Sequence, residues 1–497
     1  MTKIRTRIAP SPTGYVHIGT MHNALFAHAL AKHNHGDFIL RIEDTDRKRF
    51  VEGAAEELYK MLDEFGLTPD EGPEQGGPYE PYIQSERVSS GIYMQKAQEL
   101  VSKGYAYYCF LTEEELSEIK MRKEYKNKAF RSPYRDLTTE EAEQRISQGE
   151  EYVIRLKVPN SEEIVVDDAI LGTVKWNSND IDDQVLIKSD GFPTYHLAVV
   201  IDDNDMKITH VTRSYEWLPS TPKQILLYKY LGYDMPVFAH SSLILDPEGG
   251  KLSKRKGTVS VKQFLVEGYL VDAIKNFLML LGWAPPVERV HGEKEREIFS
   301  HEEFIAMYAL KERQKTNAVF NREKLLWFNS QYIKNKPVEE LAEIFIKWME
   351  QYAENKLLLK FIKEDKKLAD KLVLIRERTR TLVEISETLQ FFYIAPEKLN
   401  LNIKQLKTIP NIQNVAQDVL NLIEKMEADT SRWSNEEWAA QMKIFSSKYG
   451  LKPGDSFMVL RVAVVNSPFS PPLFEAMQIL GKEEVIKRLK RLINQDR

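Results

Sequence analysis

The pattern of apolar and polar positions in the first 46 residues predicts a strand, a helix and a second strand. In KIRTRIA (3–9) the β-branched residues occupy alternate positions, as in a half-buried strand. Residues 21–36 are apolar on every side and end in a glycine, which predicts a buried helix. DFILRIEDTD (37–46) predicts a second strand with acidic residues at its carboxyl end. A helix between two strands makes them parallel, so we expect a ligand to bind beyond their carboxyl ends.

The segment from residue 105 to residue 184 mixes helix-like and strand-like patterns, and we predict that it is an α+β insertion into the first domain. It mixes charged helical stretches with the strand-like EYVIRLKVP (151–159) and LGTVKW (171–176). TTEE (138–141) has the pattern of a capping box at the start of a helix. Strand-like sequence then returns over 183–203 and 208–218.

After residue 331 the pattern predicts helices almost throughout. Residues 370–393 are one such helical stretch, and Ser434 with Glu437 predicts a capped helix start. VAVVNSP (462–468) is the strand-like exception.

These segments predict a multi-domain protein with an α/β Rossmann-type parallel-sheet catalytic domain, an α+β insertion in it, and an all-α C-terminal region. A chain of 497 residues is too long for one core. The expected boundaries are 1–104 and 185–245 for the two halves of the nucleotide-binding domain, 105–184 for the insertion, 246–330 for a further domain, and 331–400 and 401–497 for two helical subdomains.

Composition excludes some classes of protein. The net charge is −5, whereas proteins that coat nucleic acid are usually basic; an RNA-binding face is still allowed, because only that face must be positive. Cys109 is the single cysteine, which rules out intramolecular disulfides and multi-thiolate zinc sites and fits a reducing cytoplasm. The longest apolar runs, such as FLMLLGW (277–283), are too short to span a bilayer.

The stretch PSPTGYVHIGTMHNAL (10–25) follows the first strand, where nucleotide-binding folds place phosphates. Gly14 and Gly19 allow the backbone to approach a ligand closely, and His17 could donate a hydrogen bond to a phosphate oxygen. The same stretch also fits a tight strand-to-helix turn. Further histidines stand at positions 22, 28, 33 and 35, but helical spacing separates them and no acid or thiol joins them, so we expect no metal site.

A cationic segment further along the chain favours the phosphate-binding interpretation of residues 10–25 over the tight-turn interpretation. KLSKRKG (251–257) could close over a triphosphate and neutralise its charge. HIGT (17–20) and KLSKR (251–255) together resemble the HIGH and KMSKS signatures of class I aminoacyl-tRNA synthetases. The flanking RIAPSPTG, RIEDTD, QSER, KSDGFPTYHLAVVIDD and VTRSYEWLPSTPKQ resemble bacterial glutamyl-tRNA synthetases in order and spacing, from residue 5 to about 330 and more weakly beyond.

The resemblance implies a glutamate–tRNA ligase that uses ATP, with Mg²⁺ bound to the ATP phosphates, and assigns roles to particular residues. ATP would be bound by His17, Gly19, Thr20, Lys251, Ser253 and Lys254, with His17, Lys254 and Lys251 as the catalytic groups. Glutamate would be bound by Arg7, Ala9, Ser11, Glu43, Tyr195 and Arg213, and we expect Arg7 to take the side-chain carboxylate.

For tRNA, the resemblance implies that 105–184 binds the acceptor end, 246–330 contacts the stem and the helical subdomains read the anticodon. Trp217, Arg376, Arg378 and Arg380 are the candidate contacts. It also implies that VAVVNSP is part of a buried helix. We expect a cytoplasmic monomer acting on tRNA(Glu); whether tRNA(Gln) is charged too stays open.

Two departures from the family pattern stand out. Thr20 replaces the second histidine of the HIGH signature, and the cysteines that hold zinc in some relatives are missing, so no structural zinc is expected. The alternatives are a cytidylyl-type nucleotidyltransferase with a similar histidine signature, a shortened relative that glutamylates a tRNA base, and a non-catalytic RNA-binding paralogue. The first two are shorter chains, and the third would be expected to lose His17, Glu43 or Lys254.

Overall fold

The computed structural model describes residues 3–46, 49–121, 129–250, 252, 259–285, 296–394, 406, 408–426, 434–467 and 471–494. The chain divides into two compact units. Unit 1 comprises Met1–Gln263 and Ile274–Arg322, and unit 2 comprises Phe264–Ala273 and Glu323–Arg497. None of the helices in the described ranges is long and apolar enough to cross a membrane.

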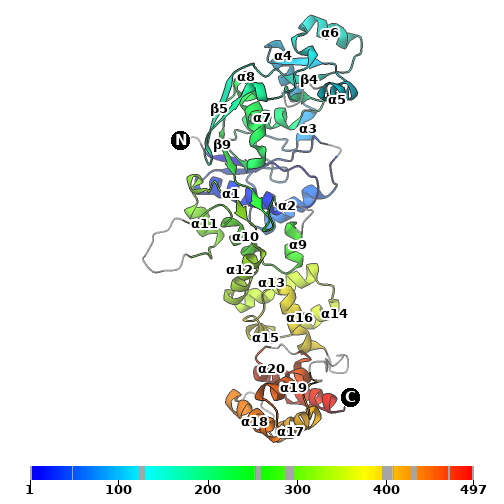
Figure 1. Ribbon diagram of the computed structural model, residues 1–497, viewed down its shortest axis with the longest axis vertical. Helices are drawn as coiled ribbons and strands as arrows, with labels where there is room; N and C mark the ends of the chain where they lie inside the picture. The colour runs from blue at the N-terminus through cyan, green and yellow to red at the C-terminus, as the bar shows by residue number, and fades with distance from the viewer. Residues whose placement is uncertain are drawn as a thin grey trace. The chain divides into compact units, whose positions relative to one another are not determined.

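The predicted strand–helix–strand unit opens unit 1 (Figure 1). Strands β1 (Arg5–Ile8) and β2 (Asp37–Leu40) are parallel, with Arg7 opposite Ile39, and helix α1 (Ile18–His33) connects them. The helix begins three residues earlier than the pattern predicts, because the His17 side chain caps it by accepting from the Gly19 amide. The second strand ends at Leu40, before the acidic residues.

A second parallel pair, β8 (His210–Ser214) and β9 (Val237–Ser241), lies beside β1, since the Thr209 amide donates to the Arg5 carbonyl at 3.0 Å. The strand expected over 183–203 is correct only for β7 (Val185–Ile187). Its second half forms helix α7 (Tyr195–Asp205). Residues 197–203 of this helix are all buried, and a helix buried on every side has the same apolar pattern as a buried strand.

The segment predicted to be an insertion combines two small sheets with helices. Strands β3 (Ala106–Cys109), β4 (Val153–Leu156) and β7 form an antiparallel sheet, with α5 (Glu113–Met121) and α6 (Thr139–Ser147) beyond it. The capping box predicted at Thr138 and Glu141 is confirmed. Figure 1 shows α5, α6 and β4 together at one end of unit 1, away from α1 and α11.

Strands β5 (Glu163–Asp168) and β6 (Gly172–Asn177) form a hairpin whose turn contacts β9. The Ala169 amide donates to the Phe238 carbonyl at 2.8 Å, so the hairpin turn packs on β9. Further elements of unit 1 and of the chain segments that lead into unit 2 include α2 (Ala54–Glu64), α3 (Gln84–Val88), α4 (Ile92–Ser102), the 3₁₀ turn η4 (Tyr215–Ser220), α8 (Thr221–Leu231), β10 (Ile244–Leu245), α9 (Val261–Val266), α10 (Val271–Met279), α11 (His301–Met307) and β11 (Ala318–Val319).

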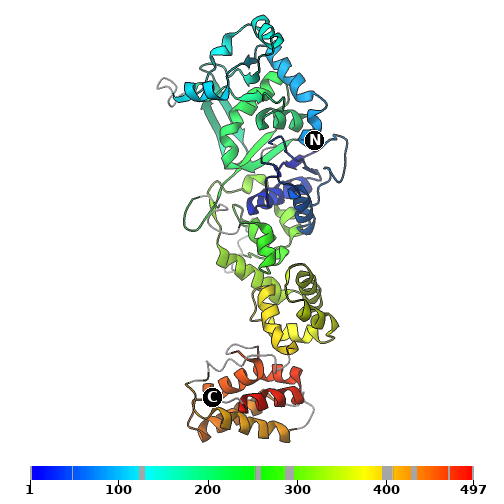
Figure 2. The same ribbon diagram turned by 90° about the vertical axis from the view of Figure 1, so that its right-hand side faces the viewer.

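In its described residues, unit 2 contains only helices and turns. Its helices are α12 (Arg322–Asn335), α13 (Val338–Tyr352), α14 (Lys356–Glu364), α15 (Leu368–Ile375), α16 (Leu382–Tyr393), α17 (Ile412–Lys425), α18 (Asn435–Lys448), α19 (Pro453–Val465), α20 (Leu473–Leu480) and α21 (Lys482–Ile493). In Figure 2 the last of them, coloured orange to red, pack as a bundle. The strand-like VAVVNSP lies mainly in α19, as the family resemblance implied, and the predicted cap at Ser434 is confirmed.

The pattern predicted one continuous helix over 370–393, but the structure has two helices there. It breaks between α15 and α16, where Thr381 caps the second helix by accepting from the Glu384 amide. The buried Asn329 amide donates to the Arg380 carbonyl at 2.6 Å, and the Leu382 amide donates to the Gly268 carbonyl. Hydrogen bonds to distant residues therefore fix a turn that local helical propensity does not reveal.

Candidate active site

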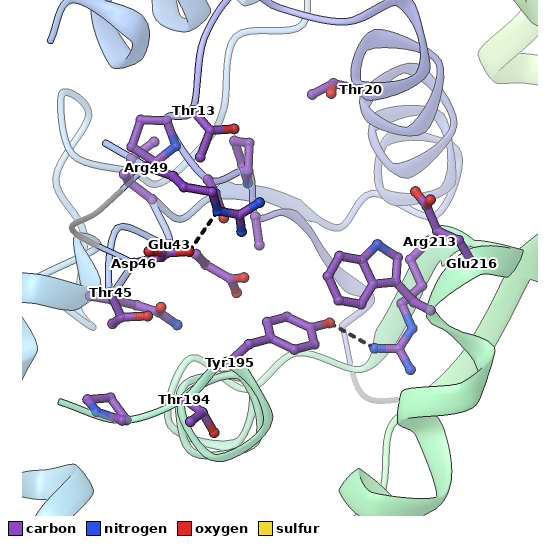
Figure 3. A pocket seen from close by; sticks show the side chains of 18 of the residues that line it. Thr13, Thr20, Glu43, Thr45, Asp46, Arg49, Thr194, Tyr195, Arg213 and Glu216 are labelled. Carbon is purple, nitrogen blue, oxygen red and sulfur yellow. Dashed lines mark hydrogen bonds and ion pairs between the residues drawn. The ribbon is translucent and has the colours of Figure 1, made fainter. Parts of the chain in front are cut away.

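A cavity of about 1510 Å³ opens in unit 1, where β1, β2 and β8 end (Figure 3). Ten of the residues expected to bind ATP, glutamate or tRNA line it: Arg7, Ala9, Ser11, His17, Gly19, Thr20, Glu43, Tyr195, Arg213 and Trp217. Leu252 also lines it, whereas Lys251, Ser253 and Lys254 lie outside the described residues. The fold therefore gathers side chains that are up to about two hundred positions apart in the sequence.

Beneath the cavity, Arg7 and Arg41 share the carboxylate of Asp203. The Arg7 Nε lies 3.1 Å from Oδ1 of Asp203, and the Arg41 Nη1 lies 2.7 Å from the same oxygen. The Arg41 Nη2 also donates to Oε1 of Glu43 at 2.9 Å. Burial alone would raise the pKa of Asp203, but the charges of Arg7 and Arg41 outweigh it and the pKa lies below its usual value.

A second buried acid, Asp202, completes this network. It accepts from the Tyr93 hydroxyl at 2.9 Å and from the Gln84 amide at 2.8 Å, and its Oδ1 lies 2.8 Å from Nε of Arg87. Counting Glu43, three buried acids face the three buried arginines, Arg7, Arg41 and Arg87, so the charges at the base of the cavity are close to balanced. A neutral floor can be buried at lower cost than an unmatched charge.

Arg213 differs from these arginines because no carboxylate in the described part of the chain pairs with it. Its Nε donates to Nε2 of His240 at 2.9 Å, its Nη1 to the Tyr195 hydroxyl at 3.1 Å and its Nη2 to the Thr221 hydroxyl at 2.9 Å. The side chain is buried, and burial lowers its pKa, as expected for a cation held among neutral groups. Such a site favours an anionic ligand that restores the missing negative charge.

Figure 3 shows how the polar groups meet around the cavity. The Tyr195 hydroxyl points toward Arg213 on one side, and Glu43 approaches the same space from the other. The Trp217 ring lies 4.5 Å from the Tyr195 ring and is 39% exposed, so it forms part of the wall. The cavity thus presents a cation and an anion to one ligand, which suits a zwitterion such as an amino acid.

The stretch around His17 forms another part of the wall. The His17 Nδ1 accepts from the Gly19 amide at 2.9 Å, which places the ring proton of a neutral imidazole on Nε2. The Ile18 amide donates to the Val259 carbonyl, and the Val261 amide to the Val16 carbonyl. These bonds bring the chain that follows the basic segment 251–257 beside the start of α1.

Two of the histidines on α1 hydrogen-bond to distant backbone carbonyls. Nε2 of His22 lies 2.8 Å from the Leu281 carbonyl, and burial lowers the pKa of His22 to about 3. Nδ1 of His33 lies 2.7 Å from the Ile305 carbonyl. Across the described ranges, no group of three or more histidine, cysteine or acidic side chains is placed to hold a metal ion.

Arg376, Arg378 and Arg380 belong to unit 2. The sequence pattern predicted that they lie on a helix, but the structure places them outside one. They lie at the end of α15 and in the turn before α16. The Arg376 guanidinium donates to the Lys336 carbonyl at 3.2 Å, and Arg380 pairs with Glu384 at 3.0 Å. The side chains of Arg378 and Arg380 are exposed.

Comparisons with known proteins agree with this arrangement. The description "tRNA synthetases class I (E and Q), catalytic domain" matches residues 3–327, and "Anticodon binding domain" matches residues 340–493. The chain belongs to the family of class I tRNA synthetases for glutamate and glutamine. The fold class predicted from the sequence, with its catalytic domain and helical anticodon-binding region, is therefore confirmed.

Individual relatives are similar over the whole length of this synthetase. The glutamate–tRNA ligase of Finegoldia magna is 40% identical over 99% of this chain and 100% of its own. That of Clostridium botulinum is 40% identical over 98% of this chain and 97% of its own. A crystal structure of a glutamate tRNA ligase from Elizabethkingia meningosepticum in complex with its amino acid has a TM-score of 0.83 and 36% identity, and 99% of each chain is covered.

Sequence reasoning overlooked part of the synthetase's site, namely Arg41, Asp202, Asp203, Thr221 and His240. Signals for some of them were available. Arg41 directly follows four residues of the β2 strand that are largely apolar, and Asp202 and Asp203 end the apolar run of α7. Charges at the ends of buried segments are rarely left unpaired, so the two elements could have been matched.

We expect Asp203→Asn to destabilise unit 1 by about 3 kcal/mol, because it leaves the buried charges of Arg7 and Arg41 poorly compensated. Differential scanning calorimetry at pH 7 would measure the loss. Asp136→Asn is the matched control, since Asp136 is 86% exposed and pairs with Lys157 at 3.2 Å; it should cost less than about 1 kcal/mol. Equal unfolding temperatures for the two variants would contradict the role of Asp203.

The same variant has a defined pH dependence. The folded-state pKa of Asp203 lies below its usual value of about 3.9, so its stabilisation is present above about pH 4 and is lost as the pH falls through the folded-state pKa. The difference between the wild type and Asp203→Asn should shrink in that acidic range.

Proposed function

We propose that this chain is a glutamate–tRNA ligase that works in two steps. In the first, an oxygen of the glutamate α-carboxylate attacks the α-phosphorus of ATP and pyrophosphate leaves. In the second, a hydroxyl of the terminal tRNA ribose attacks the carbonyl carbon of the adenylate and AMP leaves. The observation that carries this proposal is the buried Arg213 opposite Glu43, which pairs with no carboxylate among the residues that the structure describes, in a chain whose relatives include glutamate–tRNA ligases matched along their whole length.

In this proposal, glutamate lies between the two arginines and Glu43. Arg7 and Arg213 take the two carboxylates, with Arg7 on the side chain, and the free oxygen of Glu43 accepts from the substrate ammonium together with Ser11. Tyr195 donates a hydroxyl, and Ala9 borders the pocket. Glutamine would present a neutral amide to a buried guanidinium, and a site of this kind can discriminate by roughly 10⁴-fold.

ATP would lie beside His17. The Nε2–H of His17 and the amides near Gly19 and Thr20 would donate to the phosphates, aided by the amino end of α1. Thr20 supplies an uncharged hydroxyl where the family signature has a second imidazole. Lys251, Ser253 and Lys254 would close over the triphosphate; the hydrogen bonds of Val259 and Val261 to the chain at the start of α1 support this part of the proposal. Magnesium would enter as part of Mg·ATP, held chiefly by phosphate oxygens.

For tRNA, we propose that residues 105–184 bind the acceptor end, that 246–330 contact the stem and that 331–400 and 401–497 read the anticodon. Trp217 would border the 3′ end in the cavity, and the exposed Arg378 and Arg380, with Arg376, would contact the anticodon arm. We further propose a monomer that acts in the cytoplasm.

The direct test is a charging assay with purified enzyme, labelled glutamate, ATP and either tRNA(Glu) or tRNA(Gln). We expect acid-precipitable glutamyl-tRNA with tRNA(Glu), and none when glutamine replaces glutamate. Charging of both tRNAs would identify a non-discriminating enzyme. Absence of charging on either tRNA would overturn the proposed function.

Arg7→Ala should lower glutamate-dependent ATP–pyrophosphate exchange, measured with tRNA present, by at least about 30-fold, because a charge-assisted contact in a dry site contributes about 2–3 kcal/mol. Arg5→Ala is the matched control: Arg5 is on the same strand but pairs with Asp37 and Glu71 and does not line the cavity. Near-normal exchange by Arg7→Ala would refute its role.

Lys254→Ala should slow the single-turnover rate of adenylate formation about 100-fold while leaving ATP affinity within a few-fold of wild type, because its charge acts on the transferring phosphoryl group. Lys256→Ala removes the same charge two positions later, outside the KLSKR segment, and should have a small effect. An unchanged single-turnover rate for Lys254→Ala would contradict the assignment.

A further inference from the structure

Behind Arg213 lies a chain of buried hydrogen bonds that reaches the β5–β6 hairpin. The Arg213 Nε donates to Nε2 of His240 at 2.9 Å, and Nδ1 of His240 lies 2.6 Å from Oδ2 of Asp168. His240 is fully buried and Asp168 is 3% exposed. Asp168 is the last residue of β5, in the segment predicted to be the insertion. These hydrogen bonds therefore connect that segment to the cavity.

The donors and acceptors along this chain allow one protonation pattern. Burial alone would raise the pKa of Asp168, but His240 and the amides of Ile170 and Leu171 outweigh it and keep the carboxylate ionised. An ionised carboxylate can only accept, so the single proton of neutral His240 must lie on Nδ1. Nε2 is then an acceptor, which is what the Nε–H of Arg213 requires.

This pattern also determines how Arg213 faces the cavity. A guanidinium has five N–H groups, and His240, Tyr195 and Thr221 accept from three of them. Among the contacts within the described ranges, one N–H remains on each of Nη1 and Nη2. A pair of N–H groups on the two terminal nitrogens is the arrangement that binds both oxygens of one carboxylate.

We propose that Asp168 and His240 are positioning residues for the amino-acid site: Asp168 fixes the His240 tautomer, and His240 holds Arg213 in the orientation that grips a substrate carboxylate. The inference rests on the proposed function, because it takes glutamate to be the ligand of Arg213. It extends the amino-acid site to the β5–β6 hairpin, whose residues do not line the cavity.

Asp168→Asn tests the inference with little change in shape. The asparagine oxygen would keep the Ile170 and Leu171 amides, so its NH₂ group would face Nδ1 of His240. The imidazole proton would then move to Nε2, where it opposes the Nε–H of Arg213. We expect the KM for glutamate to rise roughly 10- to 100-fold, by analogy with the loss of the outer hydrogen-bond partner of a metal-binding histidine, with the KM for ATP within twofold of wild type.

Asp167→Asn is the matched control, because Asp167 precedes Asp168 on β5, is exposed and accepts from the Thr173 hydroxyl at 2.7 Å. It should leave both KM values unchanged. A folded Asp168→Asn enzyme with a wild-type KM for glutamate would overturn the inference. So would equal increases in the two KM values, which would indicate general damage to unit 1.

A pair of variants at His240 provides a second test that holds even where Asp168→Asn fails to fold. Glutamine can place its amide oxygen near the position of Nε2 and accept from Arg213, whereas asparagine reaches only the position of Nδ1 and leaves Arg213 without its acceptor. We expect His240→Asn to raise the glutamate KM at least fivefold more than His240→Gln. Equal glutamate KM values for the two variants would contradict the positioning role of His240.

The wild-type exchange reaction in the same series separates this inference from the proposed function. Absence of glutamate-dependent exchange by the wild type would overturn the function itself. Normal wild-type exchange together with an unaffected Asp168→Asn enzyme would overturn only the positioning role.

Discussion

The Asp203 carboxylate, shared by two buried arginines, is the interaction on which the rest of the catalytic unit depends. Arg7 comes from β1, Arg41 follows β2 and Asp203 lies on α7, so one acid joins three elements that are up to 196 positions apart. Each arginine would be costly to bury alone, and their attraction to one carboxylate offsets that cost only when all three elements are in place. The ends of the parallel strands are thereby held at the base of the cavity.

The arginines of this unit fall into two kinds, and the difference between them gives the site its chemistry. Arg41 and Arg87 have acidic partners within the protein, and their charges are already balanced before any ligand binds. Arg213 is held by neutral groups only, in the part of the chain that the structure describes. A buried cation without its counter-charge raises the free energy of the empty site, and a carboxylate of the ligand relieves that penalty.

Rigidity in this site comes from neighbours that lie behind the groups facing the cavity. His17 is oriented by capping its own helix, and Arg213 is oriented by His240, Tyr195 and Thr221. The His240 imidazole is in turn held by Asp168 from the β5–β6 hairpin. A binding group whose direction is set in advance loses little freedom when its ligand arrives, which increases both affinity and selectivity.

The sequence by itself determined the family, the parallel strand–helix–strand unit, the capped helices at Thr138 and Ser434 and ten of the residues that line the cavity. These features are encoded locally, in periodicity, capping residues and short motifs. Only the tertiary structure decided that residues 195–203 form a helix and that the helix expected over 370–393 breaks, because burial on every side and the hydrogen bonds that Asn329 donates and Gly268 accepts act over long sequence distances. The same reason kept Arg41, Asp203, His240 and Asp168 out of the predicted site: each matters through a partner that only the folded chain brings near.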